Sequence, residues 1–407
     1  MSTGIEAINA YVGRAFVDVR DLFTDRGLSM SRFDNLMMTQ KSVNLPCEDP
    51  VTNAVNAARP LVAGLSPAEL AGIELLVVGT ESGLDFGKPI STYVHHHLGL
   101  PSRCRSFEVK HACYGGTAAL QTAAALVETS PSPSARALVV AADAPSNGAR
   151  GTYWEPSEGA GAVAMLVGRD ARVLALDPGA SGWHTYEVMD TARPAVETDV
   201  VDSDLSLLAY LSCLENCFAA YCDRVPGTDV VGTFDHLVFH TPFAGMVKGA
   251  HRTLLRKLRR LDAAGIERDF AARMAASLHY AARVGNLFSA AIYLALCSLL
   301  EQAPSDRTRR IGLFSYGSGC ASEFFSGVVP AGARPGLDIG AQLDDRRRLT
   351  VGEYDKLTAG SDQRAFGVRE AVFDAAGYGP VFDSHVAGRG LLVLDRIRDY
   401  HREYRWA

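Results

Sequence analysis

The sequence lacks the features that mark several classes of protein. Its 407 residues include eight cysteines but no CxxC pair, and the cluster at positions 213, 217 and 222 has no histidine at a zinc-ligand spacing. The cysteines are therefore predicted to be reduced and mostly packed in the core. The adjacent residues His95, His96 and His97 point in different directions on a helix or strand, so no metal site is expected there.

Basic charge and long apolar runs are also scarce. The formal net charge of -6 argues against a general affinity for nucleic acid. The N-terminal residues 1–16 contain no basic segment followed by an apolar core, so no secretory signal is predicted. The longest membrane-like run, residues 287–300, is too short to span a bilayer comfortably. We therefore expect a cytoplasmic protein that binds neither nucleic acid nor a membrane.

One cysteine lies where a strand-like segment meets an Ala-rich apolar helix. Cys113 is followed by Gly115 and Gly116, which allow a tight turn, and then by the predicted helix at 118–127. A thiol at a helix N-terminus is near the positive end of the peptide dipoles, which favours the thiolate. The free amides there can donate hydrogen bonds to an oxyanion. Considered alone, Cys113 fits a buried structural cysteine better than a nucleophile.

The order of predicted elements repeats along the chain. Short apolar runs predict strands, and two longer apolar runs predict buried helices. Two related halves, residues 1–170 and 171–407, predict an α/β architecture of five alternating sheet and helix layers. The first half has strands at 74–80, 136–143 and 159–167; the second has strands at 235–240, 311–316 and 322–329, with its helix at 287–300.

Four chemically capable residues occupy matching places in this repeat. Glu81 and His240 follow corresponding strands, while Cys113 and Asn286 precede corresponding helices. If the halves pack about a pseudo-twofold axis, the four loops converge on one pocket. Cys113 could then accept an acyl group, and Glu81 could remove a proton from the carbon next to the thioester. His240 could donate to a carbonyl oxygen of a second substrate, assisted by the amide of Asn286.

Each position also has an ordinary interpretation. Glu81 could cap a helix, His240 could be a satisfied core histidine, and Asn286 could be a turn residue. Gly317-Ser318-Gly319 could be a bulge, or could supply amides to an oxyanion. The joint placement in equivalent loops favours the catalytic interpretation, and this chemistry requires no metal or redox cofactor.

Collinear motifs give the chain a strong family resemblance. It resembles the 3-hydroxy-3-methylglutaryl-CoA synthase family of the thiolase superfamily. The resemblance implies a thiolase-like five-layered αβαβα fold, an acylated Cys113, a general acid/base Glu81 and an acceptor-binding His240. The motifs are HACYGGTAAL at 111–120, FHTPF at 239–243, VGN at 284–286, SYGSGCASEFFSG at 315–327, RGLLVLD at 389–395 and YHREY at 400–404.

The same resemblance implies further binding residues around the pocket. Tyr114 lines the pocket and Asn286 contacts the acceptor thioester. The Ser318 amide helps to form the oxyanion hole, and Asp143 matches a family aspartate near the site.

Segments near the N-terminus indicate a subgroup. Residues 4–7, 18–20, 32–38 and 41–52 look like the polyketide β-branching synthases. By resemblance, the enzyme takes an acetyl group from a donor acyl carrier protein. It adds that group to the β-ketone of a polyketide on an acceptor carrier protein, giving a 3-hydroxy-3-methylglutaryl-type thioester. No intrinsic cofactor is implied, because phosphopantetheine arrives on the carriers.

Other functions compete with this one. A primary-metabolism synthase using acetyl-CoA and acetoacetyl-CoA would share the pocket motifs, although VMDTARP at 188–194 replaces the usual FxRP segment. A catalytically dead docking partner is disfavoured because all four pocket residues are present. A decarboxylating ketosynthase would pair its cysteine with two histidines rather than with a carboxylate.

Two interaction surfaces are predicted. A homodimer is expected from the fold, paired through a sheet edge beside the active site. Carrier-protein docking is assigned to Arg256, on a basic helix at 251–260 whose apolar face holds Leu254, Leu255 and Leu258, and to Arg32 in the RFDNLMM segment.

Overall fold

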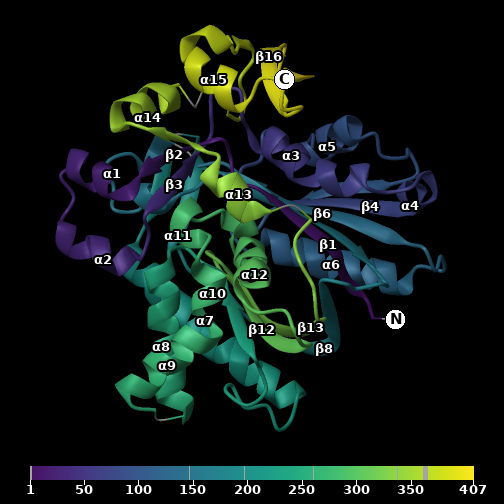
Figure 1. The fold of residues 1–407 in the computed structure, drawn as a ribbon, viewed down its shortest axis with the longest axis vertical. Helices are drawn as coiled ribbons and strands as arrows, with labels where there is room; N and C mark the ends of the chain where they lie inside the picture. Colours follow the sequence, from purple (N-terminus) through teal and green to yellow (C-terminus); the bar gives the residue numbers. More distant parts are fainter. Residues whose placement is uncertain (1, 146, 197, 260, 337, 361–364) are drawn as a thin grey trace.

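A nine-stranded sheet with the strand order β11-β12-β13-β8-β1-β7-β6-β4-β5 organises the fold (Figure 1). The computed structural model describes residues 2–145, 147–196, 198–259, 261–336, 338–360 and 365–407. The central strands are nearly continuous runs of apolar residues because they are covered on both faces. The strands are β1 (Gly4–Tyr11), β4 (Ile73–Gly79), β5 (Arg105–Val109), β6 (Arg136–Asp143), β7 (Gly161–Gly168), β8 (Leu174–Thr185), β11 (His236–Phe239), β12 (Arg309–Gly317) and β13 (Ala321–Val329).

The sheet consists of two portions with the same local topology. In the first, β4 is parallel to β6, β6 is antiparallel to β7, and β7 is antiparallel to β1. In the second, β11, β12, β13 and β8 repeat these relations in the same order. The portions join along β1 and β8 through the pairs Gly4↔Ala175 and Ile5↔Leu174. The predicted repeat of elements is therefore present in the fold.

Two helices form the layer between the sheet portions. They are α6 (Gly115–Thr129) and α12 (Ala291–Gln302), the latter preceded by the 3-10 turn η4 (Phe288–Ala290). Small residues let the halves approach closely: a Cβ on Gly116 would lie 2.3 Å from the Ser289 carbonyl oxygen. The hydroxyls of Thr117 and Tyr293 join the two helices at 2.8 Å. The second helix begins later than the predicted 287 because η4 comes first.

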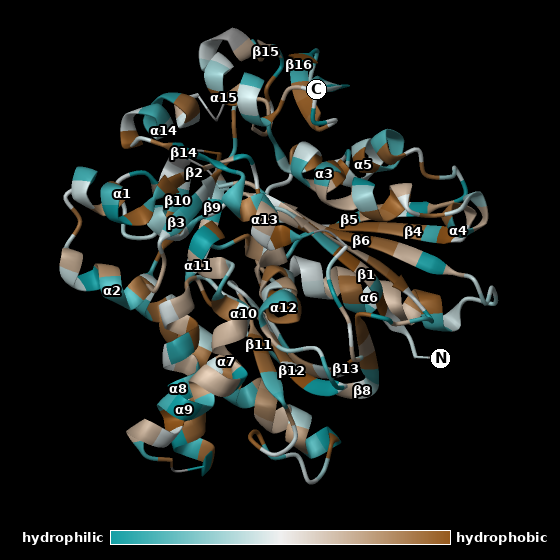
Figure 2. Ribbon diagram, viewed as in Figure 1, coloured by the Kyte–Doolittle hydropathy of each residue, from teal (hydrophilic) through white to brown (hydrophobic). Residues whose placement is uncertain are grey.

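Outer helices complete five layers of a thiolase-like αβαβα fold. The first sheet portion is covered by α3 (Pro50–Ala63) and α5 (Ile90–Leu98), and the second by α7 (Ser203–Arg224) and α8 (Ala244–Arg259). Figure 2 shows hydrophobic residues concentrated on the strands and on the inward sides of the helices. Among the described helices, α7 alone is long and apolar enough to cross a membrane, and it packs on β8 and β13 as a core helix does.

The C-terminal segment returns to the N-terminal half. Strand β14 (Arg347–Leu349) pairs with β2 (Ala15–Asp18), which pairs with β3 (Gln40–Val43). Strands β15 (Ala371–Val372), β16 (Leu392–Arg398) and β17 (His401–Trp406) form a separate sheet beside α3, at the top of Figure 1. Asn56 fastens this sheet by exchanging two hydrogen bonds with the Leu392 backbone, at 3.1 and 2.8 Å.

Candidate active site

The four predicted pocket residues lie where the repeat places them. Glu81 follows β4 and His240 follows β11, while Cys113 and Asn286 come just before α6 and η4. Asn286 is fixed by its backbone, which exchanges hydrogen bonds with Ser157 and Gly159 at 2.7 and 2.9 Å. The loops of Glu81, Cys113 and Asn286 thus meet at the N-terminal ends of the two central helices.

Cys113 and Glu81 form the central pair of the site. The thiol donates to the Glu81 carboxylate, with 3.5 Å between Sγ and Oε2. Burial and the nearby Glu81 and Asp143 carboxylates raise the pKa of Cys113 well above that of a free thiol, while a hydrogen bond from Asn286 opposes them. The helix N-terminus was expected to favour the thiolate, but burial and negative charge outweigh that effect on the Cys113 pKa.

Glu81 has the electrostatics of a general base that works near neutral pH. Burial, and then repulsion by Asp143, raise the pKa of Glu81 to about 8, while the Arg193 guanidinium opposes the increase. A base with such a pKa is mostly protonated at neutral pH, half ionised near pH 8 and fully ionised only well above that.

Asp143 anchors the loop that carries Glu81. Its buried carboxylate accepts hydrogen bonds from the Thr80 hydroxyl at 2.8 Å and from the backbone amides of Glu81 and Ser82 at 2.8 and 3.1 Å. The amide of Ser289 in η4 also donates, at 3.0 Å, as does the Ser289 hydroxyl. Hydrogen-bond donors from both halves of the chain thus use both oxygens of the Asp143 carboxylate. The geometry therefore favours a positioning role for Asp143 over direct contact with substrate.

His240 is held as a neutral imidazole. Its side chain is buried, with 1% exposed, and burial lowers the pKa of His240 to about 3. Its carbonyl oxygen accepts from the Tyr210 hydroxyl at 2.8 Å, which fixes the backbone. Its Nδ1 has no hydrogen-bond partner within the described parts of the chain. A neutral imidazole with an unpaired nitrogen can donate to or accept from a bound substrate.

The turn between β12 and β13 comes close to the start of α6. A Cβ on Gly317 would lie 2.5 Å from the Tyr114 amide nitrogen, so the Ser318 turn lies against the Cys113 loop. Asp190 secures this turn by accepting from the Gly319 amide at 3.0 Å and from the Tyr316 hydroxyl at 2.7 Å. The Ser318 turn and the Cys113 loop are therefore held against one another.

Tyr114 connects the nucleophile's helix to the opposite sheet portion. Its hydroxyl donates to Glu323 Oε2 at 2.8 Å, and Gln121 donates to the other oxygen of the same carboxylate at 2.9 Å. Burial raises the pKa of Glu323 to about 7. The tyrosine hydroxyl is thus engaged by β13, while its backbone forms the N-terminal cap position of α6.

Sequence reasoning missed Arg193 as a member of the site. It lies on β9 (Thr191–Ala195), and its Nε donates to Asp199 on β10 (Thr198–Val201) at 2.6 Å. Its charge opposes the rise in the Glu81 pKa. The signal was present in VMDTARP at 188–194, a segment already singled out in the sequence.

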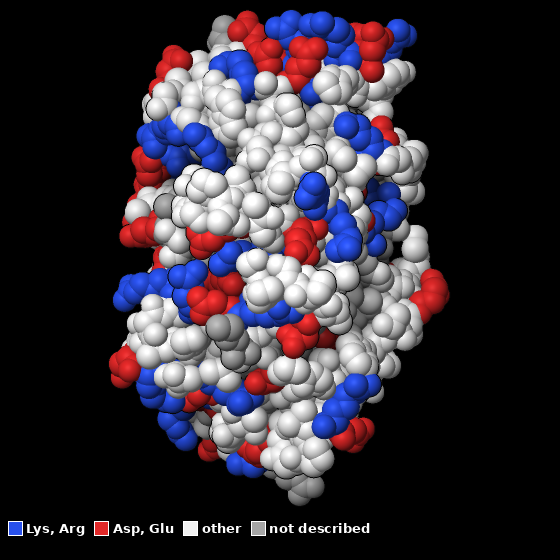
Figure 3. Space-filling model, turned by 90° about the vertical axis from the view of Figure 1, so that its right-hand side faces the viewer, with Lys and Arg blue, Asp and Glu red and all other residues white. Residues whose placement is uncertain are grey.

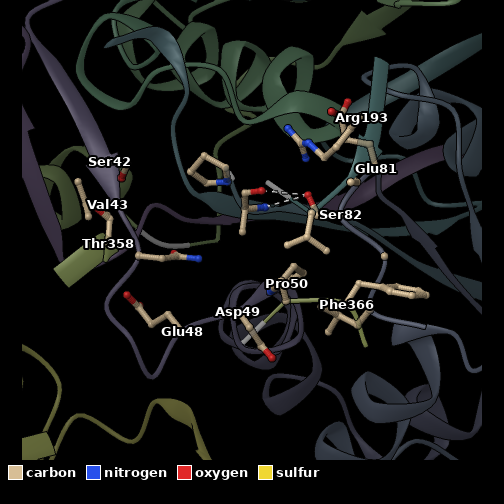
Figure 4. Close-up of a pocket in the computed structure, with 18 of the residues that line it drawn as sticks. Ser42, Val43, Glu48, Asp49, Pro50, Glu81, Ser82, Arg193, Thr358 and Phe366 are labelled. Atoms are coloured by element: carbon tan, nitrogen blue, oxygen red, sulfur yellow. Dashed lines mark hydrogen bonds between the residues drawn. The ribbon is translucent and has the colours of Figure 1, made fainter. Parts of the chain in front are cut away.

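A cavity of about 290 Å³ adjoins Glu81. Figure 4 shows Glu81 and Arg193 together on one side of it, with Glu48 and Asp49 on the opposite side. The lining comes from β3, the start of α3, the loop after β4, β9 and the region of α14 (Val351–Thr358). It comprises Lys41, Ser42, Val43, Asn44, Glu48, Asp49, Pro50, Glu81, Ser82, Gly83, Leu84, Phe86, Ala144, Pro145, Arg193, Pro194, Ala195, Val196, Tyr354, Thr358, Ala365 and Phe366.

The two predicted docking residues are exposed and lie on two different helical elements. Arg32 ends the short turn η1 (Met30–Arg32), with its guanidinium 4.3 Å from the Tyr153 ring centre. The adjacent α2 (Phe33–Leu36) contacts α8, whose last turn carries Arg256. The predicted apolar face of this helix needs one correction, because Leu258 is 45% exposed. It lies on the solvent side of α8, where packing against the sheet does not reach.

Surface charges of both signs are mixed on another face of the molecule. On the face that carries α5 and the C-terminal strands, basic and acidic side chains are interspersed (Figure 3). Within the described ranges, no three His, Cys, Asp or Glu side chains gather as a metal site would require.

The fold and the site together define a thiolase-like enzyme with a cysteine–carboxylate pair. The chain belongs to the hydroxymethylglutaryl-CoA synthase family, whose N-terminal model matches residues 1–172 and whose C-terminal model matches residues 174–264 and 256–405.

Individual relatives refine this assignment. The polyketide biosynthesis 3-hydroxy-3-methylglutaryl-ACP synthase PksG of Bacillus subtilis is 48% identical over 100% of this chain and 99% of its own length. The hydroxymethylglutaryl-CoA synthase of Enterococcus faecalis is 37% identical over 88% of this chain and 92% of its own. The crystal structure of the curacin pathway HMG synthase superposes with a TM-score of 0.96 at 48% identity, covering 100% of both chains. That synthase has also been solved with apo, holo and acetyl donor-ACP. The higher identity to polyketide synthases favours that branch over primary metabolism.

Proposed function

We propose that this chain is a cytoplasmic polyketide β-branching synthase that uses acetyl-Cys113 as its covalent intermediate. A donor acyl carrier protein supplies the acetyl group on its phosphopantetheine. A second carrier protein presents the β-ketone of a polyketide. The two halves, residues 1–170 and 171–407, supply Glu81 with Cys113 and His240 with Asn286 and Ser318, respectively.

In the first step the Cys113 sulfur attacks the acetyl thioester. A bond forms between Sγ and the acetyl carbonyl carbon, and the carrier thiol leaves with the proton that Cys113 gives up. Amides of the Cys113 loop and of the Ser318 turn stabilise the tetrahedral oxyanion. Glu81, 3.5 Å from Sγ, lies beside the acetyl group that this step places on Cys113.

In the second step Glu81 removes a proton from the acetyl methyl group. The resulting carbanion attacks the β-ketone carbon of the acceptor. The alkoxide formed takes up a proton equivalent to the one that Glu81 removed, so the ketone oxygen becomes a hydroxyl and Glu81 is again a base. His240, neutral because burial lowers its pKa to about 3, hydrogen-bonds to that oxygen as its negative charge develops. Asn286 orients the acceptor thioester with an amide that does not titrate.

In the last step water hydrolyses the Cys113 thioester. This frees a carboxylate on the product and regenerates the thiol. The product leaves as a 3-hydroxy-3-methylglutaryl-type thioester on the acceptor carrier. Phosphopantetheine is thus the only prosthetic group in the cycle, and both copies belong to the carriers.

The enzyme is proposed to work as a homodimer. Strand β5 ends the sheet and leads directly into the Cys113 loop. Pairing of two copies at this edge would extend the sheet and bring the two Cys113 loops near one another. Arg32 and Arg256 are proposed to receive the acidic donor carrier.

The observation that carries the proposal is the Cys113–Glu81 pair, with 3.5 Å between Sγ and Oε2. It occurs in a chain whose sequence is 48% identical to the polyketide synthase PksG. The test supplies acetyl groups on a donor carrier protein or on coenzyme A, and a β-ketoacyl acceptor carrier protein, with product detected by mass spectrometry. Product from the carrier donor at low donor concentration supports the proposal. Equal efficiency with acetyl-CoA and acetoacetyl-CoA would instead assign the chain to primary metabolism.

A further inference from the structure

The cavity beside Glu81 is a second compartment of the active site. Glu81 forms part of its wall, whereas Cys113, His240 and Asn286 are not among its described lining residues. Its volume of about 290 Å³ is near the lower end of the range for small-molecule sites. Glu81 therefore belongs both to the pair with Cys113 and to a separate space of ligand size.

Charged groups of the cavity wall are bound within the protein. Lys41 Nζ donates to the Glu155 carbonyl oxygen at 2.6 Å and to the Tyr354 hydroxyl at 3.1 Å. Asp49 accepts from Arg402 Nη1 at 3.0 Å. These groups have partners already, so they do not call for a charged ligand.

Asn44 is different, because its amide is buried without partners. The side chain lines the cavity and the residue is 5% exposed. Neither Nδ2 nor Oδ1 has a hydrogen-bond partner within the described parts of the chain. A buried amide normally has its hydrogen bonds satisfied, so this one indicates a ligand that carries a polar oxygen or nitrogen.

The rest of the wall and the rim suit an apolar chain. Val43 and Leu84 contribute apolar wall, and Phe86 and Phe366 form an edge-to-face pair with ring centres 4.3 Å apart. The two rings come from loops far apart in the sequence, yet both line this cavity (Figure 4 labels Phe366). Phe86 is 97% exposed, so the face of its ring is open to a chain at the mouth of the cavity.

The proposed reaction determines which part of the acceptor substrate reaches the cavity beside Glu81. Glu81 takes the proton from the acetyl methyl carbon, and that carbon then bonds to the acceptor β-carbon. The β-carbon must therefore come within reach of the Glu81 carboxylate, and whatever is attached beyond it must occupy space beside Glu81. An acetoacetyl acceptor carries only a methyl group there, whereas a polyketide carries a long chain.

We propose that the cavity binds the acceptor acyl chain beyond its β-ketone, and that Asn44 hydrogen-bonds to an oxygen or amide group on that chain. This inference rests on the proposed function and adds the acceptor class: an extended, mostly apolar acyl chain with at least one polar substituent. The Phe86–Phe366 pair contacts the chain where it leaves the cavity.

The test compares acceptors of different length on one carrier protein. The wild type receives acetoacetyl, a plain twelve-carbon β-ketoacyl chain, or the same chain with a hydroxyl or amide substituent. Because one buried methylene changes affinity by about fourfold, kcat/KM for the acceptor should rise with each carbon that enters the cavity. Ala195→Trp should narrow the cavity and abolish this gain; Ala192→Trp, on the same strand but outside the lining, should not.

Two further variants test the rim and the polar contact. Phe86→Ser should lower kcat/KM for long acceptors only, with Leu208→Ser on α7 as the exposed-residue control. Asn44→Leu should lose about tenfold with the substituted chain, as expected for one lost hydrogen bond, while the plain chain reacts as before.

The outcomes are distinguishable. Slower Cys113 acetylation, or slower condensation of acetoacetyl, in Ala195→Trp would overturn the inference and assign the cavity to the phosphopantetheine arm. No dependence of the wild type on chain length would also overturn it while leaving the proposed function intact. Failure of the wild type to be acetylated at all would overturn the proposed function itself.

Discussion

Replacing Glu81 by glutamine isolates the base from the nucleophile. The substitution keeps the size of the side chain 3.5 Å from the Cys113 thiol and removes its ability to take a proton. The acetyl group should still reach Cys113. Moreover, since the Glu81 charge helps to raise the Cys113 pKa, the neutral amide should lower that pKa and leave the thiol no less reactive above neutral pH.

The expected loss of rate appears in deprotonation of the acetyl methyl group and in formation of the carbon–carbon bond. General-base catalysis is worth about 10²–10⁴ in rate, or about 3–5 kcal/mol of barrier. In the wild type, ionisation of Glu81 with a pKa of about 8 should make exchange of the acetyl methyl protons rise with pH and level off above that value. At pH 6 about one carboxylate in a hundred would be ionised. The Glu81→Gln profile should be low and flat.

The assay follows deuterium uptake into the acetyl-enzyme by mass spectrometry, alongside product formation. The dependence of folding stability on pH supplies a control for correct folding of the variant. The folded-state pKa of Glu81 is raised, so the folded state keeps a proton that the unfolded state has lost between about pH 4.5 and 8, and stability falls as pH rises through that window. Glu81→Gln should therefore melt no lower than the wild type at pH 8. Unchanged exchange in a folded variant would mean that another group is the base.

Three other outcomes follow from the site and its surroundings. His240→Ala should slow condensation by about 10²–10³ while sparing acetylation, because the acceptor carbonyl arrives only in the second step; equal loss in both steps would make His240 the partner of Cys113. Arg32→Glu with Arg256→Glu should cut acetyl transfer from the donor carrier by about tenfold or more, with a smaller defect at high salt and none with a small acetyl thioester. Equal loss with both donors would rule out docking. Light scattering at micromolar concentration should give twice the mass of one chain, whereas a monomer would reject pairing at β5.

The strands and central helices were predictable because burial on both sides leaves long apolar runs. Strand β6 has the predicted bounds 136–143, and α6 contains the predicted 118–127. The internal repeat then placed Glu81, Cys113, His240 and Asn286 at the ends of matching elements. Those positions depend on element order alone, which a sequence displays directly.

Other features depend on contacts between distant segments. Nothing in the local pattern around Leu392 indicates that its backbone pairs with Asn56. The charge of Arg193 near Glu81 requires β9 to fold over the pocket. The direction of the Cys113 pKa could not be predicted, because a helix dipole can be recognised from sequence, whereas burial and two nearby carboxylates cannot.

Intact-protein mass spectrometry with peptide mapping tests the central claim most directly. After incubation with acetyl-loaded donor carrier protein and no acceptor, the account predicts one added acetyl group on the peptide containing Cys113, and none in Cys113→Ala, which should also form no product. An acetyl group on another cysteine, with Cys113→Ala still active, would contradict it.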